Sequence, residues 1–154
     1  MNLYDAVPPE SDYSTSFKKQ HFGAYGDMEW HTTPHWDAPV YYGNVNSIWP
    51  VRTVAGSVSE NEWVCFYSRR QSQRTCDQVL RTSVSTGSSS QMVAMKNDNS
   101  VGGDSGGPWS FYDKAYGIHQ GDSSICDVDG CRLRNVFSRV SFLPVALGVR
   151  VRTQ

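Results

Sequence analysis

Positions 103–108 read GDSGGP, which places a serine in a run of glycines. Glycine lets the backbone turn tightly, so the N–H groups of Gly103 and Ser105 can point at one spot. Two convergent N–H donors stabilise an oxyanion, and a serine hydroxyl beside them could attack a carbonyl carbon. The alternative is an ordinary glycine-rich turn that contains a serine.

These six residues strongly resemble the nucleophile motif of trypsin-like serine proteases of the chymotrypsin fold. The resemblance implies that Ser105 is the nucleophile and that the N–H groups of Gly103 and Ser105 form the oxyanion hole. It further implies a serine endopeptidase that hydrolyses peptide bonds through an acyl-enzyme on Ser105, with no cofactor and no metal. The alternative function is a non-catalytic binding module, a pseudoprotease that keeps the same turn.

Two later segments extend the resemblance toward a substrate pocket. Residues 115–118 followed by Gly121 are similar to the strand that forms one pocket wall in this family, and residues 135–140 are similar to the strand that closes the pocket. A Lys or Arg substrate side chain would need a buried acid near residues 97–100, where Asp98 lies. The resemblance implies substrate contacts from these residues: Gln120, Gly121, Asp122 and Asn135.

The catalytic aspartate is expected before Ser105, because the triad of this family follows the chain order His, Asp, Ser. Residues 26–30, GDMEW, are similar to the aspartate segment of the family, a buried acid that enters a strand. We therefore predict that Asp27 orients an imidazole and stabilises its charged form. Asp12 and Asp37 are weaker candidates for this role. The structural alternative is that Asp27 only forms a turn at the start of a strand.

The family's histidine lies in a small-residue–His–Cys motif well before the aspartate, and residues 1–26 hold no such motif. We therefore expect the chain to be the C-terminal part of a longer precursor that begins after the histidine segment. An upstream segment of that precursor would then be a partner. No histidine of the chain matches the family motif: His21, His31, His35 and His119.

The cysteines fall in two local pairs, Cys65 with Cys76 and Cys126 with Cys131. Four cysteines allow three connectivities, of which the local pairing is the simplest. The spacing does not fit the paired CxxC clusters of a zinc ribbon, so disulfides in an oxidising compartment are expected.

Residues 63–76 resemble the segment that opens the second barrel in bacterial, streptogrisin-like members, so the resemblance implies a secreted protein. In such enzymes a buried arginine can neutralise the aspartate that precedes the nucleophile. Arg69 or Arg70 is therefore expected to pair with Asp104. A buried carboxylate without any partner would cost several kcal/mol.

The elements that must position these residues are mainly β-strands. Short β-prone runs at 63–67, 92–95, 115–119 and 135–138 stand between turn-rich segments, and only 142–147 suggests a helix. Periodicity alone does not distinguish a barrel from a sandwich. The resemblance implies an all-β, chymotrypsin-like double antiparallel β-barrel with a short C-terminal helix. An incomplete first barrel at 1–57 would carry Asp27, and a second at 58–154 would carry Ser105 and the pocket.

The composition argues against polyanionic partners. A formal net charge of -1 offers no positive excess for nucleic acid or an anionic membrane surface. No apolar run approaches the roughly 20 residues that a membrane span needs. The expected partner is a polypeptide substrate.

Overall fold

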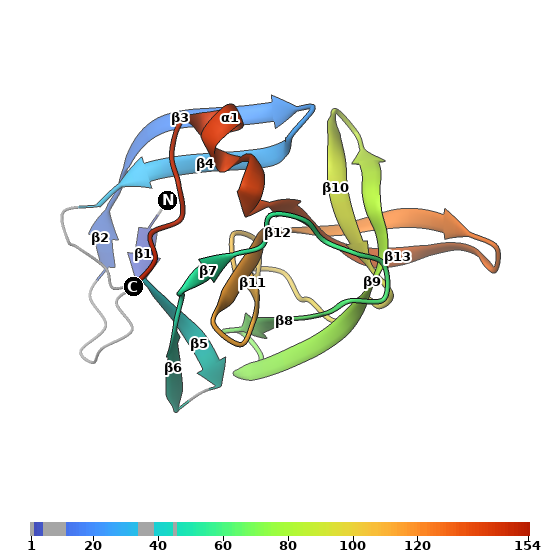
Figure 1. The fold of residues 1–154 in the computed structure, drawn as a ribbon, viewed down its shortest axis with the longest axis horizontal. Coiled ribbons are helices and arrows are strands. Elements are labelled where there is room, and N and C mark those ends of the chain that lie inside the picture. Colours follow the sequence, from blue (N-terminus) through green and yellow to red (C-terminus); the bar gives the residue numbers. More distant parts are fainter. Residues whose placement is uncertain (1, 5–11, 34–38, 45) are drawn as a thin grey trace.

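The computed structural model describes residues 2–4, 12–33, 39–44 and 46–154. This part of the chain is built almost entirely of β-strands, with one short α-helix near its C-terminal end (Figure 1). The predicted all-β class with a short C-terminal helix is therefore confirmed.

Three antiparallel hairpins come first. They pair β1 (Asn2–Tyr4) with β2 (Asp12–Ser14), β3 (Ser16–Gly23) with β4 (Gly26–Thr32), and β5 (Val40–Asn44) with β6 (Ser47–Pro50). In Figure 1 they lie to one side of the larger sheet. The β3–β4 hairpin carries Asp27, which lies opposite Phe22.

A seven-stranded sheet forms the rest of the molecule, in the order β11-β8-β9-β10-β13-β12-β7. Because β11 pairs with both β8 and β12, the sheet closes on itself as a barrel. Short β7 adds in parallel to the start of β12. The strands are β7 (Thr53–Val54), β8 (Trp63–Ser68), β9 (Gln73–Thr86), β10 (Ser89–Met95), β11 (Pro108–Phe111), β12 (Lys114–Asp127) and β13 (Gly130–Arg139).

The interior of this barrel is filled by large apolar side chains. Trp109 is 1% exposed and lies between two aromatic rings, with centroid distances of 4.8 Å to Phe66 and 5.3 Å to Phe137. Trp109 follows the GDSGGP turn directly. Burial of this ring therefore anchors one end of the turn in the core.

The C-terminal helix packs against the strand that carries Asp27. After a 3-10 turn at Val140–Phe142, α1 (Leu143–Leu147) forms a buried cluster that includes Met28, Leu143 and Leu147. Apolar burial thus fixes β4 beside the barrel, next to the end of β13. The helix was expected at 142–147 and begins one residue later.

Gly26 lets β4 approach β13 closely. A Cβ at this position would meet the Ser138 Oγ at 2.6 Å, and its φ is +102. Only glycine satisfies both constraints without displacing a strand. The main chain of β4 therefore lies close to Ser138, whose hydroxyl forms hydrogen bonds with the backbone of the next residue, Asp27.

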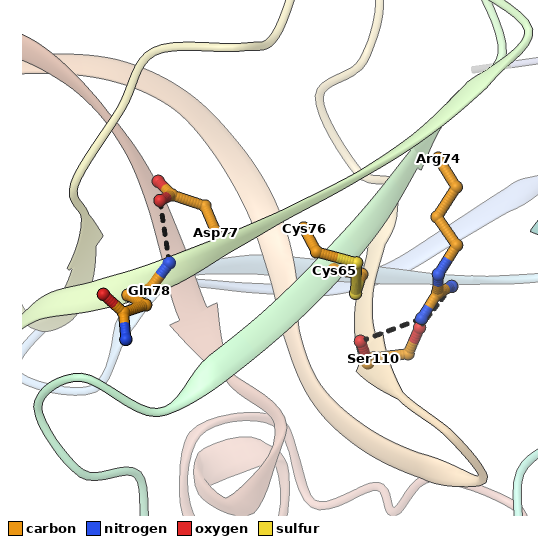
Figure 2. The surroundings of a disulfide bond; sticks show 6 residues. All are labelled: Cys65, Arg74, Cys76, Asp77, Gln78 and Ser110. Atoms are coloured by element: carbon orange, nitrogen blue, oxygen red, sulfur yellow. Dashed lines mark hydrogen bonds between the residues drawn. A yellow bond between two sulfur atoms is a disulfide. The ribbon is translucent and has the colours of Figure 1, made fainter.

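The two predicted disulfides, Cys65–Cys76 and Cys126–Cys131, are confirmed. In each, the cysteines are directly opposed partners on antiparallel strands. Figure 2 shows Cys65–Cys76 between β8 and β9, with the Arg74 side chain reaching Ser110 of β11. Arg74 also lies over the rings of Tyr41 and Trp49, and so connects the β5–β6 hairpin to the barrel.

Replacing Cys65 and Cys76 together by alanine should lower the free energy of unfolding by about 3 kcal/mol, because closure of the loop restricts the unfolded chain. Replacing Cys126 and Cys131 should cost less, since only 5 positions separate them against 11 for the first pair. Urea unfolding of both double variants measures the difference. Equal losses would contradict the loop-closure argument.

Within the described residues, no helix has the length and apolar character needed to cross a membrane.

Candidate active site

Ser105 lies on a tight turn between β10 and β11. The Asp104 N–H donates to the Val101 carbonyl at 3.1 Å, and the Gly107 N–H donates to the Asp104 carbonyl at 3.0 Å. Gly103 has a φ of +101, where a side chain would be strained. The side chain of Ser105 is presented on the exposed crest of this turn.

Within residues 103–107, the N–H groups of Gly103 and Ser105 have no acceptor in the described part of the chain. They are the two that the sequence predicts as oxyanion donors. The Ser105 Oγ donates to the Gln120 carbonyl at 3.0 Å. A developing oxyanion is stabilised by unpaired N–H donors that lie beside the attacking hydroxyl.

Asp104 is buried under this turn and has two donors. Its Oδ1 accepts from the Ser68 hydroxyl at 2.8 Å, and its Oδ2 accepts from the Val101 N–H at 2.9 Å. Neither partner is an arginine. The prediction that Arg69 or Arg70 pairs with Asp104 is therefore wrong, because a hydroxyl and a backbone amide bind the carboxylate instead. The contact between Ser68 and Asp104 could not be predicted from the sequence, because the two residues are 36 positions apart.

Asp27 is held in place by β13. Its N–H donates to the Ser138 Oγ at 3.0 Å, and Ser138 donates to the Asp27 carbonyl at 3.0 Å. Burial raises the pKa of the Asp27 carboxyl above its usual value, and the negative charge of Glu29 raises it further. No pattern in the sequence predicts this role for Ser138.

Gln120 connects the two predicted catalytic residues. Its backbone carbonyl accepts from Ser105, and its side-chain amide donates to the Asp27 Oδ2 at 3.4 Å. Its Oε1 accepts from the Thr86 hydroxyl at 3.3 Å. A cavity of about 360 Å³ is lined by Asp27, Ser105 and Gln120 together. The residue expected to be a pocket wall therefore also bridges Ser105 and Asp27.

The remaining predicted substrate contacts also lie on β12 and β13. Asp122 is opposite Asn135 in the register, and Gly121 follows an irregularity in the pairing of the two strands. Asn135 is 1% exposed, and its side-chain amide donates to Asp122 at 2.7 Å. Gly121 directly follows Gln120, so the predicted contacts on β12 are consecutive and lie beside β13, which carries Asn135.

No family model matches this chain, and no curated protein matches it. Solved structures do. A glutamic acid-specific serine protease, described as using a histidine triad in substrate binding, has a TM-score of 0.72 at 21% identity, covering 95% of this chain and 77% of that one. Cellulomonas bogoriensis chymotrypsin gives 0.72 at 19% identity, over 96% and 78% of the two chains. Nocardiopsis protease gives 0.70 at 18%, over 90% and 74%.

The chain has the chymotrypsin fold. The expectation of a chymotrypsin-like architecture similar to that of bacterial serine proteases is thereby confirmed. At these identities the likeness concerns the fold. The chemistry of this chymotrypsin-fold chain depends on its own residues.

His31 lines the same cavity as Asp27 and Ser105. Both of its ring nitrogens have partners elsewhere, since Nε2 lies 3.1 Å from the Glu29 Oε1 and Nδ1 lies 3.2 Å from the Thr15 hydroxyl. It makes no hydrogen bond with Ser105. In this arrangement His31 has no free nitrogen to accept the serine proton.

The other described histidines are structural. His119 is buried, accepts from the Trp109 indole at 3.2 Å and stacks on Phe66. Burial lowers its pKa, which favours the neutral imidazole. The Nε2 of His21 accepts from the N–H of Tyr25 at 3.3 Å. His35 and Asp37 lie outside the described residues, and of Asp12 only its place in β2 is described.

Replacing Gln120 by alanine should raise the pKa of Asp27 further, because the Gln120 amide stabilises the ionised carboxylate. Replacing Glu29 by glutamine should have the opposite effect, since it removes a negative charge that raises this pKa. Carboxyl NMR titration of the wild type and both variants checks the prediction. Shifts of the same sign in the two variants would contradict this account of the site.

Proposed function

We propose that this chain carries the nucleophile of a serine endopeptidase that hydrolyses polypeptides through an acyl-enzyme on Ser105, with a base that no described histidine of the chain supplies. One observation carries the proposal. The turn at Ser105 presents a hydroxyl and two N–H groups that have no acceptor among the described residues, and Ser105 lines a cavity together with Asp27. A turn with a purely structural role has no need for this combination.

In the proposed reaction the Ser105 Oγ attacks the carbonyl carbon of a peptide bond and transfers its proton to a base. The oxyanion formed accepts hydrogen bonds from the N–H groups of Gly103 and Ser105. The base returns the proton to the leaving amine as the C–N bond breaks, which leaves an ester on Ser105. Water then attacks this ester and gives a proton to the base, which returns it to the Ser105 Oγ as the ester bond breaks and the carboxylic acid product leaves.

The base in this proposal is an imidazole oriented by Asp27. No described histidine is hydrogen-bonded to Ser105 or to Asp27, and the Asp27 Oδ2 instead accepts from Gln120. A partly buried carboxylate is suited to hold an imidazole in one tautomer and to stabilise its charged form. We further propose that the chain is divided into two parts: residues 1–57 contribute Asp27, and residues 58–154 contribute the nucleophile Ser105.

The proposed substrate is a polypeptide that contacts β12 and β13 at Gln120, Gly121, Asp122 and Asn135. The solved structures that share the fold are named as proteases, which supports this substrate class. Two disulfides support an extracellular location, because such bonds persist in oxidising compartments.

A biotinylated fluorophosphonate tests the proposal, because it phosphonylates an activated serine. We expect slow labelling that peptide mapping assigns to Ser105 and that Ser105→Ala abolishes. Ser124→Ala, an exposed serine of β12, is the matched control and should label like the wild type. Labelling that survives Ser105→Ala would refute the proposed nucleophile.

A non-catalytic binding module is the second candidate function. The Gln120–Asp27 hydrogen bond favours it, because the donor to this carboxylate is an amide and not an imidazole. A pure binder would retain peptide binding while Ser105 resisted phosphonylation even at high probe concentration. The labelling experiment therefore distinguishes the two functions.

A further inference from the structure

A second cavity, of about 170 Å³, lies beside the turn that carries Ser105. Its lining includes Ser105, the glycines at 103 and 107, and the side chains of Tyr42 and Tyr67. Of the residues that line the cavity at Asp27, only Ser105 also lines this second one. The two cavities therefore meet at Ser105.

Two aromatic rings form a flat wall of the second cavity. The ring centroids of Tyr42 and Tyr67 are 5.3 Å apart, and their planes are inclined by 30°. Both tyrosines are half-buried, so part of each ring stays within reach of a ligand. Aromatic rings stack on one another more favourably than their buried area alone accounts for. Such a wall favours a flat aromatic group over a saturated group of the same size.

Both rings of this wall are held on one face of the barrel. Tyr67 on β8 is directly opposite Arg74 on β9, so the two side chains share a face of the sheet. The Arg74 guanidinium lies 5.4 Å from the ring centre of Tyr41 and 4.9 Å from that of Trp49, which fixes the β5–β6 hairpin on this face. Tyr42 of the same hairpin is thus placed against Tyr67 before any ligand binds, which lowers the entropic cost of binding.

The charges that line the second cavity do not favour a charged ligand. Arg69 and Asp104 carry opposite charges, and the Asp104 carboxylate already accepts from Ser68 and Val101. The ring of Pro108 adds a further apolar surface. A cavity of roughly 150 Å³ is large enough for one benzene ring, so this one has room for a single six-membered ring.

We propose that the second cavity takes an aromatic side chain, Phe or Tyr, of the bound polypeptide, and that Tyr42 and Tyr67 select it. This side chain lies on the side of Ser105 away from Gln120, which lines the other cavity. The inference rests on the proposed function, because a polypeptide that crosses Ser105 brings a side chain to this place. Gly103, a proposed oxyanion donor, lines the same cavity, so the ring lies close to the bond that Ser105 attacks.

The test is an NMR titration of the wild-type chain with N-acetyl-phenylalanine amide, with the tyrosine ring signals as the readout. The matched probe is N-acetyl-cyclohexylalanine amide, whose saturated ring has a similar size but no aromatic face. We expect saturable shifts of the Tyr42 and Tyr67 signals with the aromatic probe. The saturated probe should bind about fivefold more weakly, because it cannot stack.

Tyr42→Leu and Tyr67→Leu keep an apolar side chain and remove one flat face each, so each should reduce the preference for the aromatic probe. Tyr112→Leu is the matched control, because Tyr112 is 70% exposed on the turn between β11 and β12 and does not line the cavity. It should bind both probes like the wild type. Thermal unfolding verifies that all three variants fold.

Probe binding needs no nucleophile, so it is independent of the chemistry at Ser105. Selective binding of the aromatic probe without phosphonylation of Ser105 would refute the proposed endopeptidase and retain the cavity as a site of a binding module. Phosphonylation of Ser105 combined with equal binding of the two probes would overturn this inference alone. An unaltered preference in both leucine variants would overturn it as well.

Discussion

Peptide hydrolysis by this 154-residue chain should stay near the uncatalysed background, about a millionfold below that of a serine protease with a complete triad. A serine hydroxyl is a weak nucleophile near neutral pH and must lose its proton as it attacks. No described histidine is hydrogen-bonded to Ser105, and His31, which shares its cavity, is committed to Glu29 and Thr15. The oxyanion donors alone supply only the residual rate.

Free imidazole should recover part of the missing rate. The cavity beside Asp27 and Ser105 has a volume of about 360 Å³, which admits one imidazole ring. Because an untethered base lacks the advantage of fixed orientation, we expect an increase on the order of tenfold at high imidazole concentration. The hydrolysis rate of an activated ester should follow imidazole concentration in the wild type and less steeply in Asp27→Asn.

Fast hydrolysis without added base would contradict this account. A histidine of the chain would then serve as base, and His31→Ala and His35→Ala would identify it. An imidazole effect of equal size in Ser105→Ala would show that the ester reacts with imidazole alone. That variant is therefore the necessary blank.

Asp104→Ala should lower the free energy of unfolding by roughly 3 kcal/mol and abolish labelling of Ser105. The substitution leaves two donors under the turn without their acceptor, the Ser68 hydroxyl and the Val101 N–H. The Ser68 hydroxyl connects the turn to β8 and the Val101 N–H closes the loop itself, so the backbone that carries Ser105 should lose its fixed geometry. Chemical unfolding and phosphonate labelling measure the two effects.

Asp129→Ala provides the control for Asp104→Ala, because Asp129 is exposed and substitutions at such positions change stability by less than about 0.5 kcal/mol. Ser68→Ala should produce a smaller loss than Asp104→Ala, since the buried Asp104 carboxylate keeps its hydrogen bond from the Val101 N–H. Equal stability of Asp104→Ala and the wild type would show that the carboxylate does not hold the turn.

The features predicted correctly from the sequence are those fixed by neighbouring residues. The turn at residues 103–108 depends on glycines within six consecutive positions, so its conformation is encoded locally, while the role of Ser105 as nucleophile stays a prediction. The disulfide pairing could also be predicted from the sequence, because each disulfide joins two cysteines of one hairpin. The fold followed from the resemblance carried by this motif, since strand periodicity alone left barrel and sandwich equally open.

Contacts between distant segments could not be predicted. Asp104 was expected to meet an arginine, yet packing of β8 under the turn brings Ser68 to it. Gln120 was read as a pocket wall, and only the docking of the β3–β4 hairpin onto the barrel brings its amide to Asp27. Such contacts depend on tertiary packing, which leaves no local pattern in the sequence.

The most direct test of the central claim is to look for the acyl-enzyme itself. The chain is incubated with p-nitrophenyl acetate and imidazole, quenched in acid and mapped by mass spectrometry. We predict an acetyl group on Ser105 that is missing from Ser105→Ala and that accumulates less in Asp27→Asn. Acetylation confined to lysines and other surface groups, with Ser105 unmodified, would contradict the assignment of Ser105 as the nucleophile.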